Sequence, residues 1–245
     1  GRCGTKWITE RLEGSSKYVP IHYPRPLMRV QGRMMYEYDF NSIDEKTFHL
    51  LCEIFLAGRE EMFVRAKRAD KELAITDSRG TFYAYLIASL FPKAKFIFVH
   101  RHPLQVIRSG LKRAWYTLEN ESELSRITPR PDDSFYSSWE QMSPTQKIAW
   151  LWRETNEWIL EFLKTIPEER KHAIGFNQWQ TPQLKAMFDF MNADVSFKEI
   201  AKNLKVASNA QKSNRNPQFS GWTDKNEKEA LEICGDLAKR LNYDL

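Results

Sequence analysis

Cysteine is scarce in this chain, which contains only Cys3, Cys52 and Cys234. Three cysteines without paired spacing provide neither a disulfide framework nor a structural metal site. No run approaches the ~18 consecutive apolar residues of a membrane-spanning helix, and the sequence does not open with a secretory signal. These absences argue against a disulfide-stabilised secreted domain and against an integral membrane protein. A reducing compartment is the default, and we expect a cytoplasmic protein.

The chain also lacks a dense run of lysine and arginine, an internal repeat and a low-complexity tract. Its net charge of +5 arises from 37 basic and 32 acidic residues. Such a mild excess suits an anionic ligand, and without a basic run we do not expect a nucleic-acid partner. Hydrophobic residues make up 42% of the sequence and aromatic residues 13%. This composition is typical of a globular protein, and 245 residues suit one α/β domain.

Helical patterns and short apolar runs alternate along the chain. The apolar runs at residues 73–76, 95–100 and 173–176 predict buried strands, and their alternation with helices predicts a parallel sheet covered on both faces. Residues 14–33 are rich in proline, glycine and basic side chains and indicate a loop, and residues 119–143 indicate a loop or lid. Helices are predicted at residues 5–12, 44–59, 81–91, 103–116, 144–165, 182–191, 197–204 and 224–241.

The first seven residues, Gly-Arg-Cys-Gly-Thr-Lys-Trp, combine the features of an anion-binding loop. Glycine lets backbone N–H groups approach an oxyanion closely, Thr5 adds a hydroxyl, and Arg2 and Lys6 add positive charge. The helix that is predicted to follow points its positive end at the same place. The alternative is an ordinary basic turn before a helix. The motif Gly-x-x-x-x-Gly-Lys-Ser/Thr is absent, so the loop lacks the hydroxyl that would hold magnesium.

A second candidate anion site follows the strand predicted at residues 95–100. Arg101 comes directly after that strand, and Pro103 suits the first turn of the next helix. Ligands of open parallel sheets bind beyond the carboxyl ends of the strands, which is where we expect Arg101. Arginine can bind a phosphate through two hydrogen bonds, and Ser109 can add a hydroxyl donor. The alternative is that Arg101 stabilises a loop and Ser109 is a small packing residue.

These segments resemble those of PAPS-dependent sulfotransferases, which use 3′-phosphoadenosine 5′-phosphosulfate (PAPS) as sulfate donor. Arg2-Cys-Gly-Thr-Lys-Trp7 resembles the family's 5′-phosphosulfate loop, Lys/Arg-Ser-Gly-Thr-Thr-Trp/Leu. Phe98-Val-His-Arg-His-Pro103, with Ser109 eight residues after the arginine, resembles the 3′-phosphate element of strand, Arg, Asn/Asp and Pro. Residues 221–226 and 230–237 are similar to the C-terminal element of bacterial and Golgi-type members. The matches keep the family's order and span nearly the whole chain.

The resemblance implies a single three-layer α/β domain over residues 1–245, with a central parallel sheet flanked by helices in the P-loop NTPase-like sulfotransferase fold. It also implies that PAPS and its product PAP (3′-phosphoadenosine 5′-phosphate) bind without a metal. Because the sequence begins inside the first loop, a first strand, a signal or an anchor can precede Gly1. The residues implied to bind the donor are Arg2, Cys3, Gly4, Thr5, Lys6 and Trp7 at the 5′-phosphosulfate, Arg101 and Ser109 at the 3′-phosphate, and Lys212 and Arg215 in a closing basic loop.

The sequence departs from the family pattern at three places. Lys6 replaces the second hydroxyl residue of the loop, which exchanges a hydrogen bond for a charge. His102, in place of Asn or Asp, follows the arginine of the second element. Phe176-Asn-Gln-Trp179 stands where relatives have a stretch like Tyr-Glu-Asp-Leu.

Sulfuryl transfer needs cations at the leaving phosphate and a base for the acceptor's proton. Arg2 and Lys6 suit the first task. His22 is a candidate base, since it lies in the predicted loop after the first helix, where some family members place theirs. Asp77 is another, because it ends a predicted strand near the place where cytosolic members have a catalytic histidine, and Arg79 can instead hold the sulfuryl group. The alternatives are that His22 is a surface histidine and Asp77 caps the next helix.

We therefore expect an enzyme that moves a sulfuryl group from PAPS to a hydroxyl or amine acceptor. The fold alone leaves the acceptor open among small molecules, lipids, glycans and carrier-bound intermediates. A P-loop small-molecule kinase is one alternative, against which stands the missing magnesium-binding motif. A catalytically inactive nucleotide-binding relative that has lost its base is the other.

Overall fold

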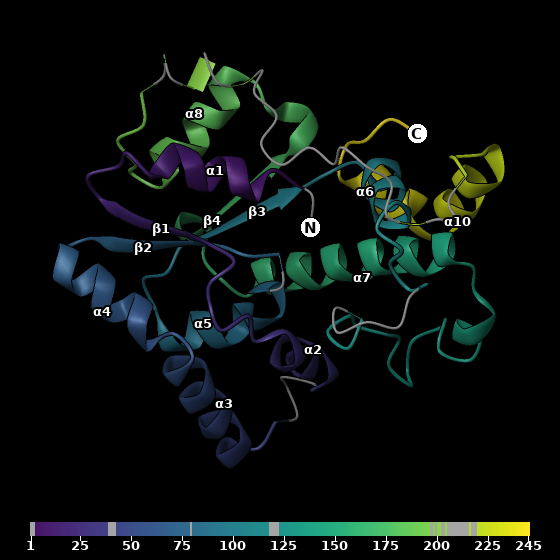
Figure 1. Ribbon diagram of the computed structural model, residues 1–245, viewed down its shortest axis with the longest axis horizontal. Helices are drawn as coiled ribbons and strands as arrows, with labels where there is room; N and C mark the ends of the chain where they lie inside the picture. Colours follow the sequence, from purple (N-terminus) through teal and green to yellow (C-terminus); the bar gives the residue numbers. More distant parts are fainter. Residues whose placement is uncertain are drawn as a thin grey trace.

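The computed structural model describes residues 3–38, 43–78, 80–117, 123–196, 198, 200–201, 204, 216 and 220–245. Within these ranges helices alternate with parallel strands, which confirms the α/β class (Figure 1). The strands are β1 (Tyr18–His22), β2 (Glu72–Thr76), β3 (Phe96–His100) and β4 (Lys171–Gly175). The helices are α1 (Thr5–Leu12), α2 (Arg29–Glu37), α3 (Glu45–Ala57), α4 (Glu60–Ala69), α5 (Ala84–Leu90), α6 (Pro103–Leu111), α7 (Pro144–Lys164), α8 (Thr181–Phe190) and α10 (Asp224–Arg240).

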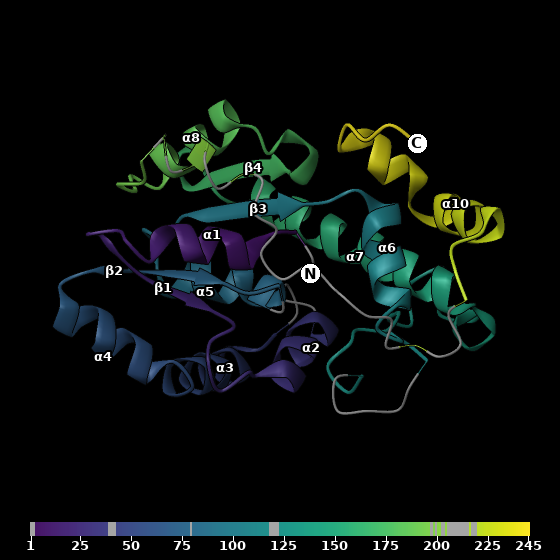
Figure 2. The ribbon, with the colours of Figure 1, turned by 45° about the horizontal axis from the view of Figure 1, so that its top comes forward.

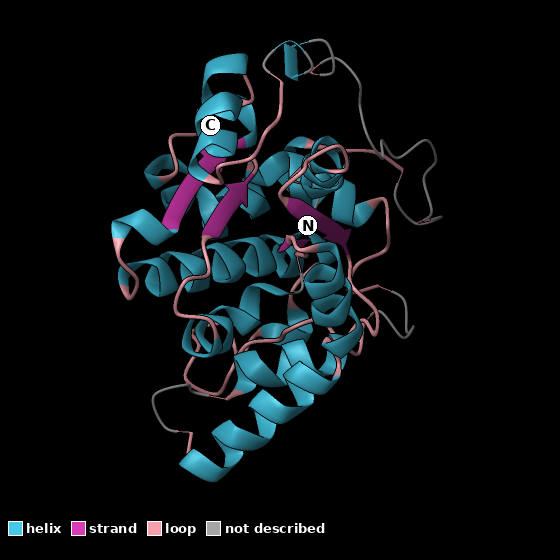
Figure 3. Cartoon of the chain, turned by 90° about the vertical axis from the view of Figure 1, so that its left-hand side faces the viewer, coloured by secondary structure: helices cyan, strands magenta, loops and turns pink. Residues whose placement is uncertain are grey.

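The strands of the described ranges form two parallel pairs, β1 with β2 and β3 with β4. In the first pair His22 lies opposite Thr76, and in the second His100 lies opposite Gly175. Helices surround the strands (Figure 3). The prediction of parallel strands is confirmed, while a single central sheet stays a prediction. Of the residues that the sequence analysis selected, His22, Asp77 and Arg101 lie at the carboxyl ends of β1, β2 and β3.

Helix α1 packs against residues of both strand pairs, and its first turn lies near the tip of β3 (Figure 2). Trp7, Ile8 and Leu12 recur at helical spacing and are at most 4% exposed. They share one apolar cluster with Ala74 of β2 and Ile174 of β4. This packing fixes the start of α1 at the edge where the strands end.

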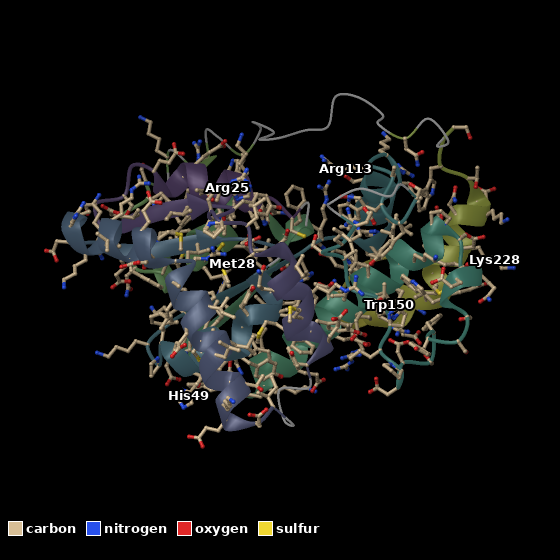
Figure 4. All side chains as sticks on the ribbon, turned by 60° about the horizontal axis from the view of Figure 1, so that its bottom comes forward. Arg25, Met28, His49, Arg113, Trp150 and Lys228 are labelled. Atoms are coloured by element: carbon tan, nitrogen blue, oxygen red, sulfur yellow. The ribbon has the colours of Figure 1, made fainter. Side chains whose placement is uncertain are left out.

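The long helix α7 supports the C-terminal half of the molecule. A capping box fixes its start, because Ser143 Oγ accepts from the Gln146 N–H at 3.2 Å and Gln146 Oε1 accepts from the Ser143 N–H at 2.8 Å. Helices α6 and α10 pack along α7. Trp150 of α7 is fully buried, whereas Lys228 lies at the outer edge of α10 (Figure 4).

The predicted loop at residues 14–33 is wrong in part, because it contains strand β1 and the start of α2. Pro20 in the middle of β1 made a strand unexpected, since proline cannot donate to a sheet ladder. Among the described strands β1 pairs only with β2, so its other edge tolerates a residue without an N–H. His22 is consequently the last residue of a strand and not a loop histidine.

Other elements agree with the expectations apart from their ends. The helix predicted at residues 103–116 ends at Leu111, and Ala114 and Tyr116 beyond it adopt left-handed backbone angles, with φ of 56° and 59°. Helix α4 was not predicted. The helix predicted at residues 197–204 lies largely outside the described residues. No helix in the described part of the chain is both long and apolar enough to cross a membrane.

Candidate functional site

The first candidate loop ends in a left-handed turn at Gly4, directly before α1. Gly4 is the N-cap residue, with φ of 82° and ψ of 10°, a conformation that favours glycine. No acidic side chain lies in the first turn of α1, which starts at Thr5. The Lys6 side chain is 48% exposed, and its Nζ lies 3.5 Å from Glu10. Cys3 is partly exposed and does not form a disulfide. The first N–H groups of α1 have no side-chain cap, which suits an anion-binding site, while the Lys6 ammonium lies beside Glu10 one turn further along the helix.

The segment that follows β4 forms a wall against this loop. The Trp179 ring lies so close to Gly4 that a Cβ atom there would overlap it. The ring centroids of Trp7 and Phe176 lie 5.0 and 4.7 Å from that of Trp179. The Trp179 indole nitrogen is buried and has no hydrogen-bond partner among the described residues. We call residues 176–179 the aromatic wall.

Arg101 reaches the aromatic wall from the end of β3. Its guanidinium carbon lies 4.4 Å from the centre of the Phe176 ring, and its Nε donates to Gln105 Oε1 at 2.7 Å. Its backbone carbonyl accepts from the Trp152 indole N–H at 2.9 Å, which anchors the chain to α7. The two candidate anion sites, far apart in sequence, therefore meet at the aromatic wall.

His102 performs the capping task for which Asn and Asp are usually chosen. It is the N-cap residue of α6, and its Nδ1 accepts from the Leu104 N–H at 3.2 Å. Its Nε2 therefore carries the hydrogen and donates to the Asp244 carbonyl at 2.9 Å. Ser109 lies further along α6 and is partly exposed. The departure from the family pattern at His102 thus leaves the helix start intact.

His22 lies at the end of β1 and is linked to α1 through Thr76 of β2. Its Nδ1 lies 2.9 Å from the Thr76 hydroxyl oxygen, which lies 2.6 Å from the Thr9 hydroxyl oxygen. Thr9 is 5% exposed and lies on α1, one turn after the candidate loop. The predicted base candidate is therefore held beside the predicted anion loop.

The electrostatic surroundings keep the His22 ring neutral at pH 7. Burial lowers the pKa of His22 below its usual value of 6.5, while the backbone at Thr76 and the Asp77 carboxylate act in the opposite direction. The Lys6 ammonium adds to the lowering of this pKa, and Glu10 opposes it. A neutral imidazole at the edge of the anion loop can accept a proton.

The Asp77 carboxylate acts electrostatically on two basic groups, His22 and Arg59. Its charge raises the pKa of His22 and also that of Arg59, a residue that is only 4% exposed and whose pKa is lowered mainly by burial. Arg59 Nη1 donates to the carbonyls of Pro26 at 2.7 Å and Gly58 at 3.0 Å.

The end of the chain covers the second strand pair. His100 is 7% exposed, and its Nδ1 lies 2.7 Å from the Tyr243 hydroxyl. Burial lowers the pKa of His100 to about 4. His100, which directly precedes Arg101, therefore links β3 to the C-terminal residues.

Several predicted site residues lie outside the described residues, namely Arg2, Arg79, Lys212 and Arg215. Among the described residues, no group of three or more His, Cys, Asp and Glu side chains is arranged to hold a metal. The described site consists of backbone N–H groups, cations, an imidazole and aromatic rings. Such a set can bind a phosphorylated aromatic ligand and accept a proton beside it.

The sequence analysis missed Phe176, Trp179, Thr9 and Thr76 as site residues. Phe176 and Trp179 follow a strand of a parallel pair, so their position at the carboxyl edge was available as a signal. No comparable signal marks the two threonines, since each is common in helices and strands. A scan against models of protein families finds no match to this chain, and a search of curated proteins finds no significant match.

Proposed function

We propose that this protein is a sulfotransferase that transfers a sulfuryl group from PAPS to a hydroxyl or amine acceptor. The observation that carries the proposal is the meeting of two sequence segments at the aromatic wall. Gly4 contacts Trp179, and Arg101 lies over Phe176. The two segments that resemble the 5′- and 3′-phosphate elements of sulfotransferases are therefore close enough to share one ligand.

Two features of the wall support a nucleotide donor. The left-handed backbone of Gly4 starts α1 with no side-chain cap on its first N–H groups, which supports an anion there, while the Trp179 ring packs against Gly4 where a side chain would lie. The buried Trp179 indole N–H lacks a protein acceptor among the described residues, and a ligand oxygen or nitrogen could serve as one. Aromatic rings beside a phosphate-binding arginine suit a purine base.

In the proposed reaction the acceptor oxygen forms a bond to sulfur as the bond from sulfur to the 5′-phosphate oxygen breaks. PAP leaves with the bonding electron pair, and the acceptor proton passes to His22. Lys6 and the N–H groups at the start of α1 stabilise the charge that grows on the leaving phosphate. Arg2 is proposed to add to this stabilisation.

The proposal includes the finer architecture. The two parallel strand pairs are proposed to belong to one central sheet with helices on both faces, because α1 packs against residues of both pairs. The acceptor is proposed to be a small molecule, a lipid, a glycan or a carrier-bound intermediate. The protein is proposed to lie in the cytoplasm.

Calorimetric titration of the full-length protein with PAP, and with ATP in the presence and absence of magnesium, tests the donor site. We expect PAP to bind more tightly than ATP, and magnesium to be unnecessary. Arg101→Ala should weaken PAP binding roughly 10- to 100-fold, as expected for the loss of a charge-assisted hydrogen bond. Arg108→Ala is the matched control, since Arg108 lies on α6, the helix that follows Arg101, with its guanidinium carbon 5.0 Å from the centre of the Trp222 ring.

Failure of folded wild-type protein to bind PAP would overturn the proposal. Equal weakening by Arg101→Ala and Arg108→Ala would show that the effect is general loss of positive charge. Magnesium-dependent binding of ATP in place of PAP would favour the kinase alternative.

A further inference from the structure

Thr9, Thr76 and His22 come from three elements and form a continuous line of hydrogen bonds. The Thr9 hydroxyl donates to the backbone carbonyl of Thr5, one turn earlier in α1, at 3.1 Å. Thr76 Oγ1 lies 2.6 Å from Thr9 Oγ1 and 2.9 Å from His22 Nδ1. Thr76 and His22 are register partners at the ends of their strands, so the line is fixed by the pairing of β1 with β2.

The number of available hydrogens determines which group is the donor in each of these hydrogen bonds. A hydroxyl has one hydrogen, and that of Thr9 points at a carbonyl oxygen, which can only accept. The contact between the two threonines therefore uses the hydrogen of Thr76. With that hydrogen committed, Thr76 Oγ1 can only accept from the imidazole, so His22 Nδ1 carries a hydrogen.

A neutral imidazole has one ring hydrogen, so a hydrogen on Nδ1 leaves the lone pair on Nε2. The charged groups that act on the ring are Asp77 after β2, and Lys6 and Glu10 on α1. Burial is the largest of the influences on the ring and favours its neutral form. The lone pair of His22 is consequently available at Nε2 near pH 7.

We infer that Thr76 and Thr9 are positioning residues that hold His22 as its Nδ1–H tautomer, so that Nε2 takes the proton of the acceptor as the acceptor oxygen bonds to sulfur. The proton transfer rests on the proposed function. The tautomer does not, because the hydrogen-bond line is complete without a ligand. The two parts of the inference can therefore be tested separately.

The tautomer is tested by ¹⁵N nuclear magnetic resonance of the imidazole nitrogens at pH 8, with His22→Gln used to assign the signals. Wild-type His22 is expected to be protonated mainly at Nδ1. Thr76→Val removes the acceptor hydroxyl and should shift the population towards Nε2–H. Thr9→Val should also shift the population towards Nε2–H. Without the Thr9 oxygen as its acceptor, the Thr76 hydroxyl can donate to His22 Nδ1, which must then be the unprotonated nitrogen. Thr76→Ser and Thr9→Ser keep the hydroxyls and should restore the wild-type spectrum.

The proton transfer is tested by measuring how kcat depends on pH, with PAPS as the donor and an acceptor that the wild-type protein sulfates. His22→Gln is expected to lower kcat about 10²- to 10⁴-fold, which is the usual contribution of a general base. Thr76→Val should lower kcat roughly 10-fold or more and shift the acidic limb of the pH profile, with the affinity for PAP retained. A merely structural role of Thr76 would lower folded protein or PAP affinity and leave the acidic limb in place.

The outcomes separate the two proposals. An unchanged tautomer in both valine variants overturns the inference even if PAP binds as expected. A changed tautomer with normal kcat in both variants also overturns it, since the tautomer would then not matter for proton transfer. Absence of PAP binding overturns the proposed function, while the spectrum still decides the role of the threonines.

Discussion

Single side chains at the candidate site have surroundings that explain unusual sequence choices. His102 serves as an N-cap through Nδ1 and binds the C-terminal backbone through Nε2, so one imidazole satisfies two elements. Gly4 combines a left-handed backbone with close contact to an indole ring. Substitution tests each position directly, because His102 caps the helix through one nitrogen atom and Gly4 is tolerated because it lacks one carbon atom, Cβ.

Gly4→Ala is expected to impair both stability and donor binding. The added Cβ would meet the Trp179 ring, and the φ of 82° disfavours any residue with a side chain. We expect a loss of about 1–3 kcal/mol in the free energy of unfolding and weaker binding of PAP. Urea denaturation and calorimetry measure the two effects. Gly14→Ala is the matched control, since no atom lies within 4 Å of a Cβ there, and equal behaviour of both variants would contradict the expected crowding.

His102→Ala should destabilise the start of α6, because the Leu104 N–H loses its acceptor. The expected cost in unfolding free energy is about 1 kcal/mol. His102→Asn should recover most of this loss, since an asparagine oxygen can accept the same hydrogen bond. Chemical denaturation of the three proteins provides the measurement. A result in which Asn and Ala are equally harmful would mean that the contact with Asp244 and not the cap carries the stability.

The helices differ in how closely they approach their neighbours, and α6 illustrates this best. A Cβ at Gly110 would lie 2.7 Å from Trp115 and 3.1 Å from Ile148 of α7. The close approach of α6 to α7 places Arg101 and Ser109 relative to the site. By contrast, Gly235 of α10 has ordinary spacing, with its nearest side-chain atom 3.6 Å away at Leu245.

These two helical glycines should respond to alanine with opposite signs. Gly110→Ala is expected to lower the free energy of unfolding by about 1–3 kcal/mol through overpacking. Gly235→Ala is expected to raise it by up to about 1 kcal/mol, because alanine has the higher helix propensity. Thermal and urea denaturation of both variants would show the difference. If Gly110→Ala were also stabilising, the contact between α6 and α7 would be looser than described.

Across the whole molecule, the C-terminal residues connect back to the strands through His100 and Tyr243. This link has a pH dependence. The pKa of His100 is lowered to about 4 by burial, from a usual value of 6.5, so the unfolded chain binds this proton more readily than the folded one. Stability that depends on neutral His100 is therefore complete above pH 6.5 and decreases as the pH falls towards 4.

We expect the wild-type protein to lose about 2–3 kcal/mol of unfolding free energy through His100 between neutral pH and pH 4.5. His100→Gln removes the titrating group and should lose less over the same interval, although it is less stable at pH 7. Urea denaturation at the two pH values gives the comparison. Identical pH dependence of the two proteins would show that other groups control acid stability.

Much of the local structure was predictable because neighbouring residues determine it. The bounds of α1 and the positions of β2 and β3 follow from hydrophobic period and from breakers such as Pro103. Strand β1 was not predicted, because the effect of Pro20 depends on whether the strand has a neighbour on that edge. Gly4 and Arg101, selected from two distant segments, both contact residues 176–179, and the binding roles of the candidate residues stay predictions.

The sequence by itself determined which residues carry charge, where glycine permits a left-handed turn, and which short apolar runs form β2, β3 and β4. Only the tertiary structure decided that Trp179 lies against Gly4, that Arg101 lies over Phe176, and that Thr9 and Thr76 direct the ring of His22. The reason is the length of chain between the partners. Contacts across such distances depend on how helices and strands pack together, and no local preference encodes them.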